Sequence, residues 1–537
     1  GHRVLLLESG GFRFDAAIQR LGDAAGQDPH HASMELTTRR QIGGASNLWG
    51  GRCVPYDPVD FLPREVTAGS RWPLSYSDLT PFFQRACEWC VCGDAVFDAR
   101  RIPALADRQI VPGFIDDGVG ATSLERWSLP TNFRRQYGKR LRRSPNLTLV
   151  TGVTCTEIVC RESGRDVDHL EIRSLDGKPA TVRAVKYVIA CGGVETTRLL
   201  FASKRTHSGG LGNHSGHLGR WYMGHVAARV AEVHFSTPPA ATIYGYERDR
   251  DGVYVRRRFT FSSELQQARR LPNSAIWLVN PTLGDASHRN GCLSLVYLML
   301  ASPLGRFFIA EQIRRAHIDA AGATSIGSHV RNVGRDLLPT VRFALAFGYE
   351  RFLRRGRKVP GFFFPSSSNT YPLEYHGEHL PSYESRIVPS AELDEVGMPR
   401  VRTHLRFAED DIAGVRRAHE CLDEALRREK VGRVRFFEDD IEAAVRRQLI
   451  RGGDHQAGTT RMSARPEDGV VDQDLAVHGF GDLYIASSST FVTSGQANPT
   501  LMIVAFALRL ADHLHRSLTA GHPAARPESR PAGAASS

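Results

Sequence analysis

The chain has 537 residues, of which 41% are apolar and 24% charged, and it contains 50 glycines. This length is enough for a two-domain enzyme with a large core, and the composition is that of a globular α/β protein, which excludes a largely disordered chain. The formal net charge of +11 suits an anionic partner or a soluble surface, but no nucleic-acid-binding motif accompanies it, so we expect no nucleic-acid partner.

The nine cysteines are odd in number and widely spread, which is not typical of a disulfide framework. We therefore expect a reducing compartment and a cytoplasmic location. Cys87, Cys90 and Cys92 share the stretch CEWCVC, but no second cysteine or histidine pair answers them at zinc-finger spacing. We favour buried small apolar side chains over a metal site there.

The first element is the stretch GHRVLLLESGG, in which an apolar run from Val4 to Leu7 ends at Glu8. This pattern predicts a buried parallel strand with a carboxylate at its C-terminal tip. In dinucleotide-binding units, an acidic residue about 20 residues after a G-x-G-x-x-G loop holds a ribose hydroxyl. Glu8 fits that role, but no such loop precedes it. The strand is either the second strand of a cofactor unit that lacks its first strand, glycine loop and helix, or an ordinary strand.

Further strand–glycine–helix patterns follow. The stretch RRQIGGASNLWGGRC (39–53) places two glycine pairs around Trp49, which lets the backbone approach a ligand beside a flat aromatic wall. Residues 79–92 read as a helix and 147–160 as a strand pair with a glycine turn. Residues 185–203 give a buried strand, a glycine turn and a helix, as expected for a doubly wound sheet.

Residues 226–450 have a different sequence pattern from the preceding part of the chain. VAARVAEVHFS, YVRRRFTFSS and the stretch 385–411 predict antiparallel hairpins with helices on one side, and LSLVYLML (293–300) predicts a core strand, since it is too short to span a membrane. Arginines gather at 314–322 and 349–358, in predicted helices that suit an acidic electron-transfer partner or a membrane surface. From Arg516 the chain is small, polar and proline-rich, which predicts a disordered tail.

The last 90 residues carry the strongest candidates for chemistry. His455 lies in the glycine-rich stretch RGGDHQAGTTRMS, and an ordinary histidine can take a proton from an alcohol because it titrates near pH 6.5. Asn498, Pro499 and Thr500 open a predicted helix over 498–514, with Asn498 as its N-cap. These residues either only begin a helix, or they place the positive N-terminal end of the helix against an anion such as a reduced flavin.

Taken together, these stretches resemble the glucose-methanol-choline family of FAD-dependent oxidoreductases over nearly the whole chain. The matching segments are GHRVLLLESGG, RRQIGGASNLWGG, ACGGVETTRLL, GLGNHSGHLGRWYMGH, EHLPSYESRIV and the run from HQAGTTRMS through GQANPTLMIVAFALRLADHL. The resemblance is strongest to the branch of sugar and polyol dehydrogenases.

The resemblance implies roles for individual residues. His455 would be the base that removes a hydroxyl proton while the carbinol carbon passes hydride to flavin N5, and Asn498 would donate to the substrate oxygen. Glu8 would hold the adenosine ribose of FAD, and Val153 would contact the adenine through its backbone. The remaining cofactor-binding residues would be Ser9, Gly10, Gly43, Gly44, Ser46, Asn47, Leu48, Trp49, Gly50, Gly51, Gly192, Ser487, Ser488, Pro499 and Thr500.

The resemblance also implies a domain plan. It gives a doubly wound, Rossmann-like FAD-binding domain of the α/β class, lacking its first strand and glycine loop, and an α+β substrate-binding domain on a mainly antiparallel sheet. The FAD-binding domain would be formed by residues 1–80, 141–225 and 451–515, a helical insertion or lid by 81–140, the substrate-binding domain by 226–450 and the tail by 516–537.

Besides the glycine loop that does not precede Glu8, two places depart from the family pattern. Leu48 stands where some members carry the histidine that binds flavin covalently, which predicts non-covalent FAD. Ser487, Ser488 and Ser489 stand where many members read Asp-Ala-Ser, which weakens an expected ribityl contact. No metal is expected.

Three functions remain open from the sequence. The first is an FAD-dependent dehydrogenase or oxidase of a sugar, polyol or other alcohol, with a quinone, haem protein or oxygen as electron acceptor. The second is a lyase of the same fold. The third is a truncated remnant without catalytic activity.

Overall fold

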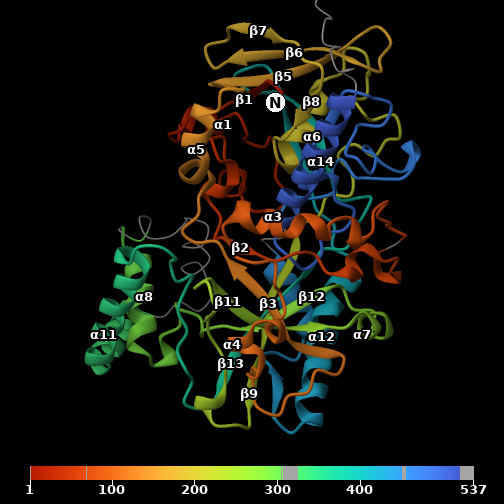
Figure 1. Cartoon of the computed structure of the whole chain (residues 1–537). Helices are drawn as coiled ribbons and strands as arrows, with labels where there is room; N and C mark the ends of the chain where they lie inside the picture. The colour runs from red at the N-terminus through yellow and green to blue at the C-terminus, as the bar shows by residue number, and fades with distance from the viewer. Residues whose placement is uncertain (1, 68, 304, 306–324, 450–454, 521–537) are drawn as a thin grey trace, which may run out of the picture.

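The computed structural model describes residues 2–67, 69–303, 305, 325–449 and 455–520. The chain forms an upper part with parallel strands and a lower part built on a large antiparallel sheet (Figure 1). The expected combination of a part with parallel strands and a part built on a mainly antiparallel sheet is confirmed.

The upper part contains two parallel strand pairs. β1 (Val4–Glu8) pairs with β4 (Leu147–Thr151), and β8 (Tyr187–Ile189) pairs with β17 (Leu483–Ile485). The strands predicted from GHRVLLLESGG and from residues 185–203 are therefore present and parallel. Within the described residues they form two separate pairs rather than one continuous sheet.

The expected strand pair at 147–160 is wrong in its pairing. Gly152 does separate two strands, and its φ of 77° explains why a glycine stands there. However, β4 pairs with β1, whereas β5 (Val153–Cys160) begins a three-stranded antiparallel sheet with β6 (Val167–Ser174) and β7 (Pro179–Val182). The turn thus passes the chain from one sheet to another.

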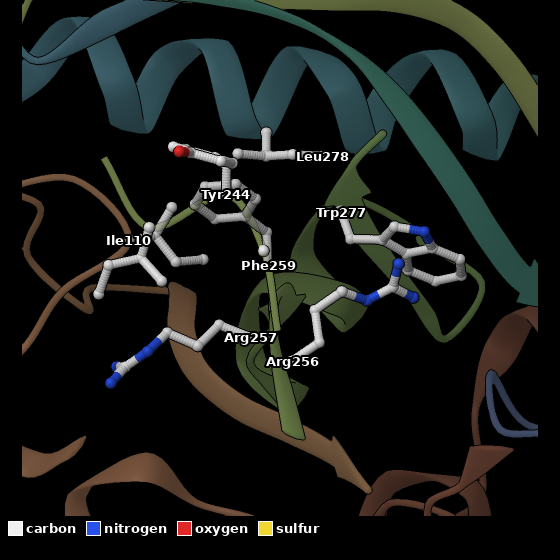
Figure 2. A pocket seen from close by; sticks show the side chains of 9 residues that line it. Ile110, Tyr244, Arg256, Arg257, Phe259, Trp277 and Leu278 are labelled. Carbon is white, nitrogen blue, oxygen red and sulfur yellow. The ribbon is translucent and has the colours of Figure 1, made fainter. Parts of the chain in front are cut away.

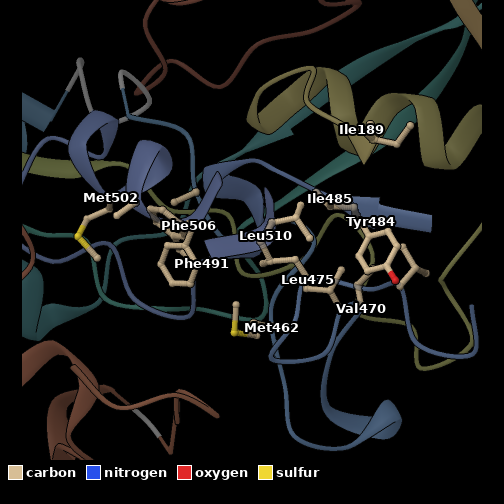
Figure 3. Close-up of a cluster of buried hydrophobic side chains, with 14 of the residues drawn as sticks. Ile189, Met462, Val470, Leu475, Tyr484, Ile485, Phe491, Met502, Phe506 and Leu510 are labelled. Carbon is tan, nitrogen blue, oxygen red and sulfur yellow. The ribbon is translucent and has the colours of Figure 1, made fainter. Parts of the chain in front are cut away.

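Helices pack around these strands and complete the upper core. Figure 3 shows side chains of β8, β17, α14 and the intervening loops gathered in one apolar cluster. α14 begins at Thr500 and continues to Ala520, so the predicted tail starts later than Arg516; residues 521–537 lie outside the described residues. The helices of this part are α1 (Ala16–Arg20), α2 (Met34–Thr37), α3 (Thr80–Cys90), α5 (Phe133–Arg143), α6 (Gly193–Ala202) and α14 (Thr500–Ala520).

The lower part is an eight-stranded sheet in which all pairs are antiparallel. β3 lies in the segment 81–140 that was expected to be a helical insertion, yet it joins this sheet between β11 and β2. The strand order is β16 (Gly432–Phe436), β9 (His225–Phe235), β13 (Thr370–Glu378), β12 (Ser274–Leu278), β11 (Tyr254–Phe261), β3 (Val119–Trp127) and β2 (Arg52–Cys53), with β10 (Glu247–Arg248) beside β11.

The two faces of this sheet differ because side chains alternate along each strand. On one face, apolar residues such as Val226, Phe259 and Leu373 form a core with α12 (Glu409–Arg428) and α13 (Ile441–Gln448). The other face carries polar and aromatic side chains, among them His225 and His376. This second face is the one that bears the candidate site.

The stretch LSLVYLML is a helix and not the predicted core strand. It forms α8 (Gly291–Ala301), and the side chain of Asn290 accepts a hydrogen bond from the backbone N–H of Leu293 at 3.0 Å, which caps the helix. A short apolar run does not by itself distinguish a buried strand from a buried helix, and here the N-cap decides.

α10 (Ile326–Arg335) and α11 (Leu337–Gly348) follow α8, and the π-helix η9 (Tyr349–Leu353) continues α11 into the arginine cluster at 349–358. The cluster at 314–322 lies outside the described residues. Short helices α4 (Pro103–Ala106) and α7 (Ser263–Ala268) flank the sheet, and β14 (Arg386–Leu393) with β15 (Pro399–His404) forms the predicted hairpin. Among the described residues, no helix is both long enough and apolar enough to cross a membrane.

The cysteines expected to be buried are buried, but they have a partner that the spacing did not reveal. Cys87, Cys90 and Cys92 are fully buried, and so is Cys53 on β2. The thiol of Cys53 contacts those of Cys90 and Cys92, and these contacts together with burial raise the pKa of Cys53. A distant strand thus brings a fourth cysteine next to these three.

His419 on α12 is a buried histidine that packs against Tyr375 and Phe436 in the apolar core of the lower part. Burial lowers the pKa of His419 to about 4, whereas the same side chain in an unfolded chain titrates near 6.5. The unfolded state therefore binds the proton first as the pH falls. We expect His419 to destabilise the fold progressively from about pH 6.5 down to pH 4, by roughly 2–3 kcal/mol at the lower end.

The substitution His419→Leu should accordingly weaken the dependence of the melting temperature on pH between pH 7 and pH 4.5. Val415→Ala, in the same core, removes apolar contacts without a titratable group and should lower the melting temperature equally at both pH values. If the melting temperature of His419→Leu depends on pH as strongly as that of the wild type, His419 is not a cause of the loss of stability at low pH.

Candidate active site

The first group of predicted residues gathers where β1, β4 and β8 end. Glu8 pairs in register with Thr151, so the end of β1 lies beside Gly152 and Val153. Glu8 accepts hydrogen bonds from the backbone N–H of Gly10 at 2.8 Å and from the Ser9 hydroxyl at 3.3 Å, but burial raises its pKa. The C-terminal ends of parallel strands are where α/β proteins bind ligands.

Arg40 joins this group to the start of α6. Its guanidinium donates to the Ser9 hydroxyl at 3.3 Å and forms an ion pair with Glu195 in the first turn of α6. Gly192, which precedes that helix, has a φ of 83° and open space where a side chain would begin. The predicted residues Glu8, Ser9, Gly10, Val153 and Gly192 therefore lie at one edge.

The second group is the glycine loop at 43–51, which is fixed mainly by side-chain hydrogen bonds. Asn47 donates to the backbone oxygens of Ile42 and Gly44, and the Trp49 indole donates to the Thr131 oxygen at 3.0 Å. Gly44 also has open space in the direction of a side chain. Around these anchors lie the other predicted members of the loop, Gly43, Ser46, Leu48, Gly50 and Gly51, and Ser46 accepts from the Phe133 N–H at 3.1 Å.

The third group is the histidine loop and the start of α14. Asn498 Nδ2 lies 3.0 Å from His455 Nε2, so the two predicted catalytic residues are in contact. Ser488 donates to the Gln456 oxygen at 2.6 Å and thereby holds the loop just after His455. Asn498 is not the N-cap of the last helix as expected, because α14 starts at Thr500 and the Asn498 side chain turns to His455 instead.

The first and the third of these groups adjoin one another. Gln456, next to His455, accepts a hydrogen bond from the backbone N–H of Val194 at the start of α6, at 3.3 Å. Thr459 further along the loop bonds to Thr197 of the same helix at 2.7 Å. The start of α6 is therefore shared between the edge that carries Gly192 and the loop that carries His455.

Two further histidines complete the site, and the sequence reasoning missed both. His455 Nδ1 lies 2.9 Å from Nδ1 of His225 on β9. The ring of His225 stacks on that of His376 on β13, with centroids 4.5 Å apart and planes inclined by 24°. His376 donates its Nδ1–H to the Gln496 oxygen at 2.8 Å. One ring nitrogen from each of the three lies within 4.8 Å of the other two.

All three rings are neutral at physiological pH. Burial, and then the charge of Arg52, lowers the pKa of His455 to about 4. Burial is also the main cause that lowers the pKa of His225 and of His376 well below the ordinary value. A neutral His455 has a free electron pair on one ring nitrogen and can therefore act as a base.

The hydrogen bonds define which nitrogen carries the proton. Asn498 donates through its amide to Nε2 of His455, so the ring hydrogen of His455 is on Nδ1 and points to His225 Nδ1. The hydrogen of His225 is then on Nε2, which is buried without a partner in the described part of the chain. The Oδ1 atom of Asn498 is likewise buried and unpaired there.

Arginine and tryptophan side chains extend the same sheet face. The Arg52 guanidinium lies 4.4 Å from the centroid of the Trp277 ring and that of Arg256 lies 4.7 Å from it. Both arginines pair with Glu125, which is fully buried. Figure 2 shows Arg256 beside Trp277. Both residues line a small cavity, together with Ile110, Tyr244, Phe259 and Leu278, and none of the three histidines lines it.

A sequence signal for the missed residues exists only in part. His225 ends the stretch GLGNHSGHLGRWYMGH and His376 precedes EHLPSYESRIV by only a few residues, but they are 151 positions apart in the chain. Their approach depends on the register of β9 with β13, which no local pattern specifies.

Comparison with known proteins shows which proteins the chain is similar to. Residues 381–507 match the family model described as GMC oxidoreductase. The chain is 23% identical to paromamine 6'-oxidase of Streptomyces fradiae, over 91% of this chain and 80% of that protein. It is 22% identical to 2-methyl-1,2-propanediol dehydrogenase of Mycolicibacterium austroafricanum, over 88% and 80% respectively.

Among solved structures, pyridoxine 4-oxidase from Mesorbium loti is similar with a TM-score of 0.51 and 16% identity, covering 96% of this chain and 94% of that one. The likeness confirms the expected fold. The matches together confirm the resemblance to the glucose-methanol-choline oxidoreductases that the sequence stretches predict.

Proposed function

We propose that this chain is an FAD-dependent oxidoreductase that converts a hydroxyl group of a sugar, polyol or other alcohol to a carbonyl. The observation that carries the proposal is the contact between a neutral, buried His455 and Asn498, in a chain whose C-terminal part matches the GMC oxidoreductase model. The relatives named paromamine 6'-oxidase and 2-methyl-1,2-propanediol dehydrogenase support a hydroxyl group as the reacting function.

The described residues fit a flavin nucleotide. Gly44 and Gly192 leave open space in the direction of a side chain, as backbone segments that approach a ligand do. Glu8 would hold the ribose, residues 43–51 would run beside the pyrophosphate and ring system, and Ser487 and Ser488 would contact the ribityl chain. Pro499 and Thr500 would present the positive end of α14 to the flavin. Leu48 supports non-covalent binding, because it offers no nucleophile to the ring.

His455 and Asn498 would handle the hydroxyl group between them. A substrate hydroxyl that replaces the present hydrogen bond receives the Asn498 amide hydrogen on its oxygen and gives its proton to Nε2 of His455. Bound FAD supplies the acceptor for the hydride that leaves the carbinol carbon.

His225 would stabilise the charge that forms on the base. When Nε2 of His455 is protonated, the ring is positive and its Nδ1–H points to the neutral His225 Nδ1, which accepts it. His376 stacks on His225 and holds the backbone at Gln496, so it keeps His225 in place. His225 is therefore a positioning residue for His455.

The acceptor that reoxidises the enzyme would be a quinone, a haem protein or oxygen. We favour a quinone or haem protein, because the resemblance is strongest to sugar and polyol dehydrogenases. The arginine cluster at 349–358 would suit an acidic haem protein.

The first test is the flavin itself. The purified chain should be yellow, acid precipitation should release free FAD, and an alcohol or sugar substrate should bleach the flavin under anaerobic conditions. His455→Ala should keep the FAD and slow bleaching by ~10²-fold or more. If His455→Ala keeps its FAD and its flavin is reduced at the wild-type rate, His455 is not the base. If the acid precipitate stays yellow, the FAD is bound covalently and the expectation for Leu48 is wrong.

The second test separates His225 from a merely structural residue. His225→Leu removes the acceptor for the His455 Nδ1–H, so the rate of flavin reduction should fall by about tenfold or more with little change in KM. His225→Asn offers an amide oxygen in its place and should restore part of the rate. If His225→Asn and His225→Leu reduce the flavin at the same rate, the hydrogen bond accepted by His225 does not contribute to the reaction.

The third test concerns pH. Because His455 must be neutral to accept a proton, kcat/KM should be constant near neutral pH and fall as the pH drops toward 4. Arg52→Met removes the charge that disfavours protonation of His455, so the fall should begin at a higher pH. Arg256→Met is the matched control, since Arg256 also pairs with Glu125 and lies over Trp277, but the charge acting on His455 is that of Arg52. Equal profiles for both variants would contradict this role of Arg52.

A further inference from the structure

Helix α11 and the turn after it expose a row of large apolar side chains. Leu338, Val341, Leu345 and Tyr349 follow one another at spacings of three and four residues, which places them on one helical face. Their exposed fractions are 62%, 46%, 71% and 57%. We call these four residues the apolar stripe.

The opposite face of the same helix is apolar too, but it packs against other aromatic rings of the protein. Phe343 lies 4.9 Å from Phe364 and 5.4 Å from Phe362 between ring centroids, and Phe347 lies 5.4 Å from Phe362. A helix that is apolar on all sides is normally buried on all sides. Here one side packs on the protein, and the apolar stripe faces outward on a part of the molecule that projects from the sheet (Figure 1).

Further exposed apolar side chains lie near the apolar stripe in the sequence. Of the 21 large apolar side chains of the described residues that are exposed, nine lie between residues 326 and 353. Besides the stripe they include Ile326 and Val330 of α10, Leu337 and Leu353. Exposed apolar patches of this kind on a soluble protein mark sites that contact another molecule or a membrane.

The same segment is strongly basic. Residues 325–358 contain eight arginines and lysines but only two acidic residues. Asp336 pairs with Arg335 at 3.0 Å, and Glu350 pairs with Arg354 at 2.6 Å. Arg342, directly after Val341 of the stripe, is exposed. The surplus of positive charge therefore surrounds the apolar side chains.

We propose that this segment seats the protein on the surface of an anionic lipid bilayer, with the apolar stripe entering the headgroup region and the arginines facing the lipid phosphates. Aliphatic side chains with flanking arginines are the composition of helices that lie in the membrane interface. A second copy fits less well, because a two-fold contact would bring the same basic segment against itself. Contact of this segment with lipid does not require the proposed reaction.

The test is binding of the purified chain to vesicles. The chain should co-sediment with vesicles of phosphatidylcholine and phosphatidylglycerol, and weakly with phosphatidylcholine alone. Leu338→Asp with Leu345→Asp should reduce the affinity by about tenfold or more, and Arg342→Glu by about fivefold at low salt. Leu393→Asp on β14 is the matched control, since Leu393 is 60% exposed but lies outside the segment, and it should bind as the wild type does.

Other outcomes would overturn the proposal. Binding that is absent, or equal in the stripe variant and the wild type, means that the stripe does not enter lipid. A dimer in light scattering that the stripe variant converts to a monomer means that a second copy covers the stripe. A melting temperature that falls far more in the stripe variant than in Leu393→Asp means that the chain itself covers it. Flavin reduction by alcohol should be unchanged in the stripe variant, so failure here leaves the proposed reaction untouched.

Discussion

The candidate site depends on one short segment, residues 494–498, which is held by both parts of the molecule. Gln496 accepts hydrogen bonds from His376 on its backbone oxygen and from Arg258 on its side chain, and it donates to Asp57 at 3.0 Å. Gly495 has a φ of 58°, and a side chain there would approach Asp60 to 2.9 Å. Contacts from both parts of the molecule therefore hold the segment that leads to Asn498.

Burial sets the chemistry of the histidines once they are in place. Three neighbouring rings would repel one another if they were protonated, and their position between the two parts of the molecule keeps them neutral. Arg52 adds a charge that opposes protonation of His455, while Glu125 balances Arg52 and Arg256 in the interior. A neutral base thus lies beside an arrangement of fixed cations, which favours loss of a proton from a hydroxyl group nearby.

The sequence predicts the local parts of this arrangement and misses the distant ones. Glu8, the glycine loop, His455 and Asn498 each stand in a short stretch with its own pattern, so the sequence singles them out, and the structure brings His455 and Asn498 into contact. The role of His225 could not be predicted, because it follows from strand register across 151 residues. The error at 293–300 has a different cause: an apolar run fits a strand or a buried helix, and only the cap at Asn290 distinguishes them.

The basic segment and the site are connected through the chain that follows η9. The Phe363 ring lies 5.3 Å from that of Tyr246, and Tyr246 lies 5.5 Å from Trp127, both measured between centroids. Trp127 is on β3, whose Glu125 pairs with Arg52 beside His455. If the apolar stripe rests on a bilayer, the strands that lead to the site follow directly from the membrane-facing segment. A lipid-soluble electron acceptor would then be concentrated next to this part of the enzyme, whereas a water-soluble acceptor would gain nothing from the attachment.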